Sequence, residues 1–222
     1  MDRVPERELM DGVEQARAYA DADFSEPHDR FVALFRARFP DAVPRRVLDL
    51  GCGPCDVTRR FARGHPGCAI TALDGSRAML DEARRRNRDA GFADRIELVE
   101  TRLPSAALAG RTFDTVLSNS LLHHLPDPAI LWTAVRGALD DGGIAYVMDL
   151  SRPRDEAVAE RLVQLHAADA PDVLRHDFHA SLLAAYRPDE VVRQLAAAGL
   201  GSFRVEVVSD RHWIAYGRGA RA

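Results

Sequence analysis

Short apolar runs alternate with longer amphipathic stretches through the middle of the chain. The runs have the length and the leucine and valine content of buried strands, and they predict strands at 46–50, 69–73, 96–99, 113–118 and 143–150. Apolar residues at helical spacing predict helices between them, at 56–63, 76–87 and 128–139, with Ser76 as the N-cap of the second. Strands that alternate with helices pair in parallel through right-handed crossovers. The pattern therefore predicts an α/β fold with a mostly parallel sheet.

Both ends of the chain depart from this alternation. Residues 5–40 contain few helix breakers and carry apolar residues at helical spacing, which predicts a helical segment before the first strand. Near the other end, a predicted helix at 188–198 closes at Gly199 and is followed by strands at 203–208 and 212–216. The gap between these two strands is too short for a parallel crossover, so they predict an antiparallel hairpin.

The same pattern divides the chain into regions. We expect an N-terminal helical cap at 1–44 and one domain at 45–222. Residues 151–187 do not fit the alternation, and we interpret them as an insertion between the fifth strand and the last helix. The insertion holds four polar residues of chemical interest: His166, His176, His179 and Tyr186.

Composition narrows the class of protein. The formal net charge is −4, so there is no basic excess to neutralise phosphates, and nucleic acid is not expected as a partner. No apolar run has the length of a membrane span, and the first residues lack the apolar region of a signal peptide, so we expect no membrane association and a cytoplasmic location. The chain has no lysine, which excludes P-loop NTPases and Schiff-base enzymes. Apolar positions on the N-terminal helices leave a homodimer open.

A glycine turn follows the first predicted strand, where the sequence reads VLDLGCGP. Gly51 and Gly53 let the backbone turn sharply and approach a ligand closely. Asp74 ends the second strand, where an acid accepts hydrogen bonds from ribose hydroxyls; the alternative role is a helix cap. A dehydrogenase fingerprint is not complete, because Asp56 stands at the position of the third glycine. Asp49, two residues before the turn, has the charge to bind a cationic group.

Four segments in order then carry a family resemblance. VLDLGCGP, ALDGSRAML, FDTVLSNSLLHHLPDP and LDDGGIAYVMDL resemble successive motifs of the class I S-adenosylmethionine (SAM)-dependent methyltransferases, in particular the small-molecule branch of ubiquinone and menaquinone methyltransferases. The resemblance runs from about residue 47 to residue 150. It implies a Rossmann-like, seven-stranded, mostly parallel sheet with a C-terminal antiparallel hairpin and helices on both faces, and a small-molecule acceptor as substrate.

The resemblance also implies a set of cofactor contacts. Gly51, Cys52 and Gly53 would line the methionine and ribose part of SAM, and Asp49 would face its amino group. Asp74 would hold the ribose hydroxyls. The adenine would be bordered by Gly75 and Met79 on one side and by Thr101, Arg102 and Leu103 after the third strand. Asn119 and Ser120 would lie under the methionine moiety, and Tyr19 would close over SAM from the N-terminal helix.

The tetrapeptide Cys52-Gly53-Pro54-Cys55 also matches the thioredoxin active site. A thiol redox function is therefore an alternative. It leaves the other three segments unexplained, and Gly51 stands where thioredoxins have a tryptophan. A milder hypothesis is that oxidation of the cysteine pair distorts the loop and blocks SAM. Cys55 also departs from the family, which often has a glycine at that position.

Three residues are candidates for catalysis. His124 follows the fourth strand, and in phosphoethanolamine methyltransferases, which this stretch resembles locally, a histidine here takes part in catalysis. We expect the adjacent His123 to face away from the site. His176 and Tyr186 lie in the insertion, where this family builds its substrate pocket, and we expect that region to act as a lid. A base is required only where the nucleophile arrives protonated.

Three further possibilities concern a metal site and other functions. A zinc or iron site formed by His123, His176 and His179 is not expected, because their spacing does not require one. A SAM-binding relative of the fold that does not methylate is one alternative function. A regulatory binding module without turnover is another.

Overall fold

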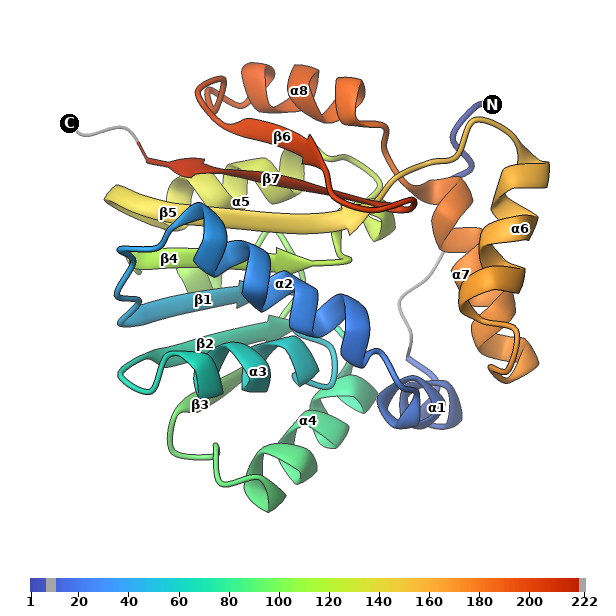
Figure 1. Cartoon of the computed structure of the whole chain (residues 1–222). Helices are drawn as coiled ribbons and strands as arrows, with labels where there is room; N and C mark the ends of the chain where they lie inside the picture. The colour runs from blue at the N-terminus through green and yellow to red at the C-terminus, as the bar shows by residue number, and fades with distance from the viewer. Residues whose placement is uncertain (7–10, 220–222) are drawn as a thin grey trace.

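A twisted seven-stranded sheet forms the centre of the molecule in the computed structural model, which describes residues 1–6 and 11–219 (Figure 1). The strand order is β3-β2-β1-β4-β5-β7-β6. The strands are β1 (Arg46–Leu50), β2 (Ala69–Asp74), β3 (Ile96–Glu100), β4 (Phe113–Asn119), β5 (Leu139–Leu150), β6 (Arg204–Val207) and β7 (His212–Arg218). The first five are parallel, and β7 is antiparallel to both β5 and β6. The order therefore reverses between β1 and β4, where such sheets bind ligands beyond the carboxyl ends of their strands.

Helices cover both faces of the sheet (Figure 1). One core cluster joins the sheet to α2 (Ser25–Arg38), α3 (Asp56–Gly64) and α4 (Arg77–Asp89). In that cluster Phe31 and Phe35 of α2 are fully buried and make edge-on contacts with the Tyr146 ring. The second cluster joins the opposite face to α5 (Ala129–Ala138) and α8 (Pro188–Ala197), around the fully buried Trp132 and Trp213.

Three helices lie beyond the carboxyl ends of the parallel strands, on the right in Figure 1: α1 (Val13–Asp21), α6 (Glu156–His166) and α7 (Asp172–Ala184). The α6 and α7 helices pack on each other through an apolar cluster that contains Leu162 and Leu182. Two short 3₁₀ turns, η1 (Ala106–Leu108) and η2 (Leu122–His124), follow β3 and β4. These helices and turns form a layer, which we call the roof, over the point between β1 and β4 where the strand order reverses.

Residues 1–6, which we call the N-terminal strap, run along this roof. The amide of Val4 donates to the Leu183 carbonyl at 3.1 Å. Arg3 donates to the carbonyls of Ala184 and His123 at 2.5 and 2.9 Å, and its guanidinium lies 4.2 Å from the centre of the Tyr186 ring. The strap thus joins the end of α7 to the turn after β4.

The sequence-based fold is confirmed, with some differences in its helices. The sheet, its mostly parallel pairing, the C-terminal antiparallel hairpin and the helices on both faces are all present. The helical segment expected at 5–40 is present as two helices, α1 and α2, separated by a break at Ala22–Phe24, and residues 7–10 lie outside the described part. The helix α2 packs into the main core. The division of the chain into a cap at 1–44 and a domain at 45–222 stays a prediction. Within the described residues, no helix is both long and apolar enough to cross a membrane.

Candidate functional site

A cavity of about 590 Å³ opens at the carboxyl ends of β1, β2, β4 and β5, beneath the roof helices. Nine of the predicted cofactor-binding residues line it: Tyr19, Asp49, Gly51, Cys52, Gly53, Asp74, Met79, Asn119 and Ser120. The opposite wall comes from the α1–α2 connection, the loop between α6 and α7, and one face of α7. The cavity is therefore enclosed by the sheet edge on one side and by the roof on the other.

The glycine turn after β1 forms the floor of this cavity. Gly51 and Gly53 have φ values of 74° and 50°, a conformation that glycine adopts without steric cost. A Cβ at Gly51 would lie 2.9 Å from the Leu121 side chain, whereas a Cβ at Gly53 would meet nothing within 4 Å. Gly51 is thus required by local packing, and Gly53 leaves space open to a ligand.

The Asp74 carboxylate is held at the end of β2 by main-chain amides. Gly53 and Ser76 each donate to it, at 2.8 Å. Burial raises its pKa, although these two hydrogen bonds act in the opposite direction. The side chain is thus fixed at the cavity wall. Ser76 caps α4 by accepting from the Met79 amide at 3.2 Å, as the sequence predicts.

A second carboxylate, that of Asp49, is buried at the base of the cavity. Its exposed fraction is 2%, and the Thr58 hydroxyl donates to it at 2.6 Å. Burial raises its pKa to about 6; the Thr58 hydrogen bond opposes this shift and the charge of Asp74 adds to it. An acid in this setting is stabilised as a carboxylate when a cationic group binds beside it.

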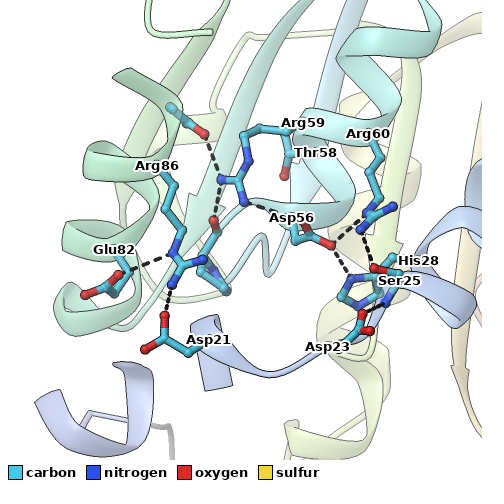
Figure 2. A network of polar contacts seen from close by, with 12 residues as sticks. Asp21, Asp23, Ser25, His28, Asp56, Thr58, Arg59, Arg60, Glu82 and Arg86 are labelled. Atoms are coloured by element: carbon cyan, nitrogen blue, oxygen red, sulfur yellow. Dashed lines mark hydrogen bonds and ion pairs between the residues drawn. The ribbon is translucent and has the colours of Figure 1, made fainter. Parts of the chain in front are cut away.

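A polar network holds the start of α3 against α1, α2 and α4 (Figure 2). His28 Nδ1 and Arg60 contact the Asp56 carboxylate at 2.6 and 2.8 Å. Arg59 donates to the Pro54 carbonyl at 2.7 Å and to Asn87 at 3.1 Å. Because Pro54 belongs to the glycine turn, the network fixes the loop that forms the cavity floor.

Beside this loop, the residues after β4 present polar atoms to the cavity. The Asn119 Oδ1 atom is buried and has no hydrogen-bond partner within the described structure, while its amide nitrogen donates to Ser120 at 3.3 Å. Ser120 has a φ of 56°, which turns the chain sharply at this point. On the opposite side, burial raises the pKa of Tyr19 to about 12, so its phenol keeps its proton.

The predicted adenine residues are only partly at the cavity. Met79 lines it, but Gly75, Thr101, Arg102 and Leu103 are not among the lining residues in the described part of the chain. The Thr101 amide donates to the Asp74 carbonyl at 2.9 Å, and Arg102 pairs with Asp11 at 3.4 Å. Their role in binding adenine stays a prediction.

Only one of the three catalytic candidates lies at the cavity. His124 lines the cavity, but His176 and Tyr186 do not, and their placement corrects the expectation for both. Tyr186 is buried in the core cluster that contains residues of α5 and α8, and the Arg3 guanidinium lies over its ring. His176 is exposed on α7. The α7 positions that line the cavity are Leu174, Asp177, Phe178 and Ser181, which lie on one face of the helix. His176 and His179 do not belong to that face.

The expectation for His123 is wrong. The η2 turn brings both histidine rings to the cavity, with ring centres 4.1 Å apart. His123 Nδ1 lies 2.5 Å from the Asp149 carboxylate of β5, and His124 Nδ1 lies 2.5 Å from the Glu6 carboxylate of the strap. Sequence reasoning missed Glu6 and Asp149. The only signal for Asp149 was its place at the end of an apolar strand; nothing in the sequence pointed to Glu6.

The metal candidates change with this geometry. His123 groups with His124 and Glu6, whose ligand atoms lie within 4.8 Å of one another, and not with His176 and His179. The three cysteines are buried with free thiols. Burial and the neighbouring Cys55 raise the pKa of Cys52 well above its usual value, which opposes the thiolate that thioredoxin chemistry requires.

A Rossmann-like sheet of this order, with a glycine turn and an acid at the carboxyl ends of β1 and β2, is the fold of the class I SAM-dependent methyltransferases. Solved structures agree. The plantazolicin methyltransferase BpumL in complex with SAH aligns with a TM-score of 0.68 and 13% identity, over 93% of this chain and 85% of that one. A SAM-dependent methyltransferase from Aquifex aeolicus aligns with a TM-score of 0.68 and 15% identity, over 93% and 98%.

Sequence comparisons point to the same family. Residues 48–145 match the model of a methyltransferase domain. A trans-aconitate 2-methyltransferase of Methylobacterium radiotolerans is 33% identical over 67% of this chain and 54% of its own length. A ubiquinone biosynthesis O-methyltransferase of Dinoroseobacter shibae is 30% identical over 70% and 59%. The chain spans about half the length of the trans-aconitate relatives it matches.

Residues 48–145 thus form a methyltransferase domain, and the chain has the fold of SAM-dependent methyltransferases, whose cofactor is SAM.

Proposed function

We propose that this protein transfers a methyl group from SAM to a small-molecule acceptor. The observation that carries the proposal is the Asp74 carboxylate, which is fixed by the Gly53 and Ser76 amides at the wall of the cavity. A fixed carboxylate accepts two hydroxyl donors without reorganisation, which suits a ribose diol.

The residues at the cavity fit the other parts of SAM. Asp49 and the unpartnered Oδ1 of Asn119 are acceptors for an ammonium group. Gly51, Cys52 and Gly53 line the floor of the cavity, where Gly53 leaves space for a ligand, and Ser120 lines it as well. Tyr19 and Met79 supply apolar surface on either side. Gly75, Thr101, Arg102 and Leu103 are proposed to contact the adenine from just outside this lining.

Bound SAM supplies a methyl group on a sulfonium cation, which a nucleophile displaces in line. The chain's own contribution is to hold the acceptor in that line and to exclude water beneath the roof helices. Among the three catalytic candidates, His124 is the one at the cavity, and we propose it as the base for an acceptor that carries a proton.

Calorimetric titration with S-adenosylhomocysteine (SAH), beside an Asp74→Ala variant, tests the cofactor assignment. We expect micromolar binding that falls by about a hundredfold or more in the variant, because a buried multi-hydrogen-bonded contact is lost. No binding by the intact protein would contradict the proposal. Incubation with SAM and candidate acceptors, read by product mass, then separates methyl transfer from the non-methylating alternative.

Four earlier expectations stay predictions: a cytoplasmic location, the absence of a nucleic-acid partner, a homodimer, and the ubiquinone-type branch of the family. The match to a ubiquinone biosynthesis enzyme supports the last of these, but trans-aconitate enzymes match as well. Size-exclusion chromatography with light scattering tests the homodimer.

A further inference from the structure

Two carboxylate–histidine pairs lie side by side at the cavity. Asp149 and His123 form the inner pair, with side chains 1% and 3% exposed and a contact of 2.5 Å. Glu6 and His124 form the outer pair, 12% and 22% exposed, with the carboxylate 2.5 Å from Nδ1 in ion-pair contact but without the alignment of a hydrogen bond. Because the two imidazole rings lie against each other, the four groups make one cluster that ends at the cavity.

The N-terminal strap delivers Glu6 to this cluster. One Glu6 oxygen accepts from the Ser181 hydroxyl at 2.7 Å, and Ser181 itself lines the cavity on α7. The other oxygen contacts His124. Three residues earlier, Arg3 is bound to the carbonyls of His123 and Ala184. The carboxylate is therefore held from both sides and is not a freely rotating surface acid.

We propose that Glu6 is a positioning residue for His124, and that the pair removes a proton from an acceptor that attacks through a hydroxyl, thiol or ammonium group and not through a carboxylate. The inference rests on the proposed function and adds the chemical class of the acceptor to it. A carboxylate acceptor is already ionised at neutral pH and requires no base.

The step balances without a further reactant. The acceptor atom forms a bond to the methyl carbon, and the bond from that carbon to sulfur breaks with both electrons left on sulfur. The acceptor's proton goes to His124 at Nε2, because Nδ1 faces Glu6. The Glu6 carboxylate then stabilises the imidazolium that forms.

The charges at the cavity wall favour the same acceptor class. Arg211 is the one arginine that lines the cavity within residues 1–6 and 11–219, and it is already paired with Asp210 at 3.0 Å and Glu26 at 3.3 Å. The acceptor side also presents the carboxylates of Asp169 and Asp177. An acceptor with several carboxylates would be repelled here, since unpaired cations are needed to hold it.

The titratable groups beside His124 come from several elements. Glu6 faces it from the strap, His123 from the same turn, Asp149 from β5 and Asp74 from β2. Burial alone would raise the pKa of Glu6, but His124 lowers it overall. Burial alone would lower the pKa of His123, but Asp149 raises it.

The first test is an NMR comparison of the imidazole nitrogen signals in the intact protein and in Glu6→Gln, with the His124 signals assigned by their absence in His124→Gln. We expect the Nδ1 signal of His124 to move in Glu6→Gln, because the carboxylate 2.5 Å from that nitrogen is replaced by a neutral amide. The matched control is Glu14→Gln, an exposed acid on α1, which leaves the signal unchanged. A His124 Nδ1 signal that is the same in Glu6→Gln and wild type overturns the pairing.

The second test concerns the acceptor. The protein is incubated with SAM and trans-aconitate, the tricarboxylate in the names of several relatives, and the products are weighed by mass spectrometry. Absence of a methyl ester supports the proposal, and formation of one overturns it. The SAH titration is run on the same sample: failure to bind SAH removes the proposed function, whereas the NMR comparison of His124 still decides the Glu6–His124 pairing.

A third measurement excludes a different use of the same atoms. Zinc chloride alone is titrated into the protein and into Glu6→Gln. Binding of one zinc ion per chain that is lost in Glu6→Gln overturns the proton-transfer role, because the metal would occupy Nδ1 of His124. Absence of such binding supports it.

Discussion

The main-chain amide of Gly53 donates a 2.8 Å hydrogen bond to the side chain of Asp74. This bond ties the glycine turn after β1 to the acid at the end of β2, so the two sequence motifs are one structural unit. A ligand that binds Asp74 therefore meets the open face of Gly53 at the same time.

The Gly53→Ala variant tests whether Gly53 leaves space for the cofactor, and a control variant accounts for the backbone strain of the substitution. The φ of 50° gives the variant a strain of about 1 kcal/mol, and the new methyl group occupies the floor of the cavity. We expect the SAH dissociation constant to rise about tenfold or more, measured by calorimetry. The matched control is Gly91→Ala, which has a φ of 74° and equally open surroundings at the end of α4. The control shares the strain, so equal SAH affinity in both variants would contradict the role of Gly53.

Asp49→Asn is expected to stabilise the protein and to weaken cofactor binding. The pKa of Asp49 is raised to about 6 in the folded state, so the folded carboxyl holds its proton at pH values where the unfolded one is ionised. The resulting destabilisation of the wild type grows as the pH rises from about 4 to 6 and reaches about 3 kcal/mol above that range. Urea unfolding without cofactor, at pH 4 and pH 7.5, measures the difference. A variant advantage that does not grow with pH would count against a buried charge at Asp49.

Asp149→Asn is expected to lower the free energy of unfolding by about 3 kcal/mol. The carboxylate accepts from the amides of Leu122 and Leu150 at 2.7 and 2.6 Å and contacts His123, so one neutral amide group cannot replace all three contacts. Burial alone would raise the pKa of Asp149, but His123 lowers it, and Asp149 raises that of His123.

The pH dependence of the stability lost in Asp149→Asn follows from the pKa shifts of Asp149 and His123. The lowered pKa of Asp149 gives stability that is present above about pH 4 and is lost as the pH falls further. The raised pKa of His123 gives stability that is fully present below about pH 6.5 and is lost as the pH rises through the folded value. The difference between wild type and variant in urea unfolding is therefore expected to be largest between about pH 4 and 6.5. A flat difference from pH 4 to 9 would contradict the ion pair.

Cys52 is expected to react slowly with thiol reagents. Because burial raises its pKa well above the usual thiol value, little of the reactive thiolate is present at neutral pH. Labelling with a disulfide reagent should be complete only after unfolding in urea, and diamide should leave SAH affinity unchanged. Rapid formation of a Cys52–Cys55 disulfide in the native protein would revive the redox alternative.

The sheet and the cofactor side of the cavity could be predicted because their signals are local. A buried strand needs an apolar run, and the turns at Gly51 and Gly53 need residues that adopt positive φ. Asp74 has a fixed distance from that turn because one crossover helix separates the two strands. Each of these constraints acts within a short stretch of chain.

The acceptor side could not be predicted as well because it depends on contacts between distant segments. Glu6 reaches His124 only because Arg3 and Val4 are anchored on the end of α7. No periodic pattern encodes that contact. The helix phase of α7 is a local signal, since Leu174, Asp177, Phe178 and Ser181 follow the spacing of one helix face. His176 does not lie on that face.

The N-terminal strap has a consequence for the order in which the molecule forms. The partners of Arg3 and Glu6 lie between 118 residues (Glu6 to His124) and 183 residues (Arg3 to Tyr186) further along the chain. These residues are synthesised before their partners, so their contacts with α7 can form only after α7 itself has been synthesised. Such distant contacts have a high loop-closure cost and form late in folding. The strands β1, β2 and β4 and the glycine turn can thus form before the histidine beside them gains its carboxylate.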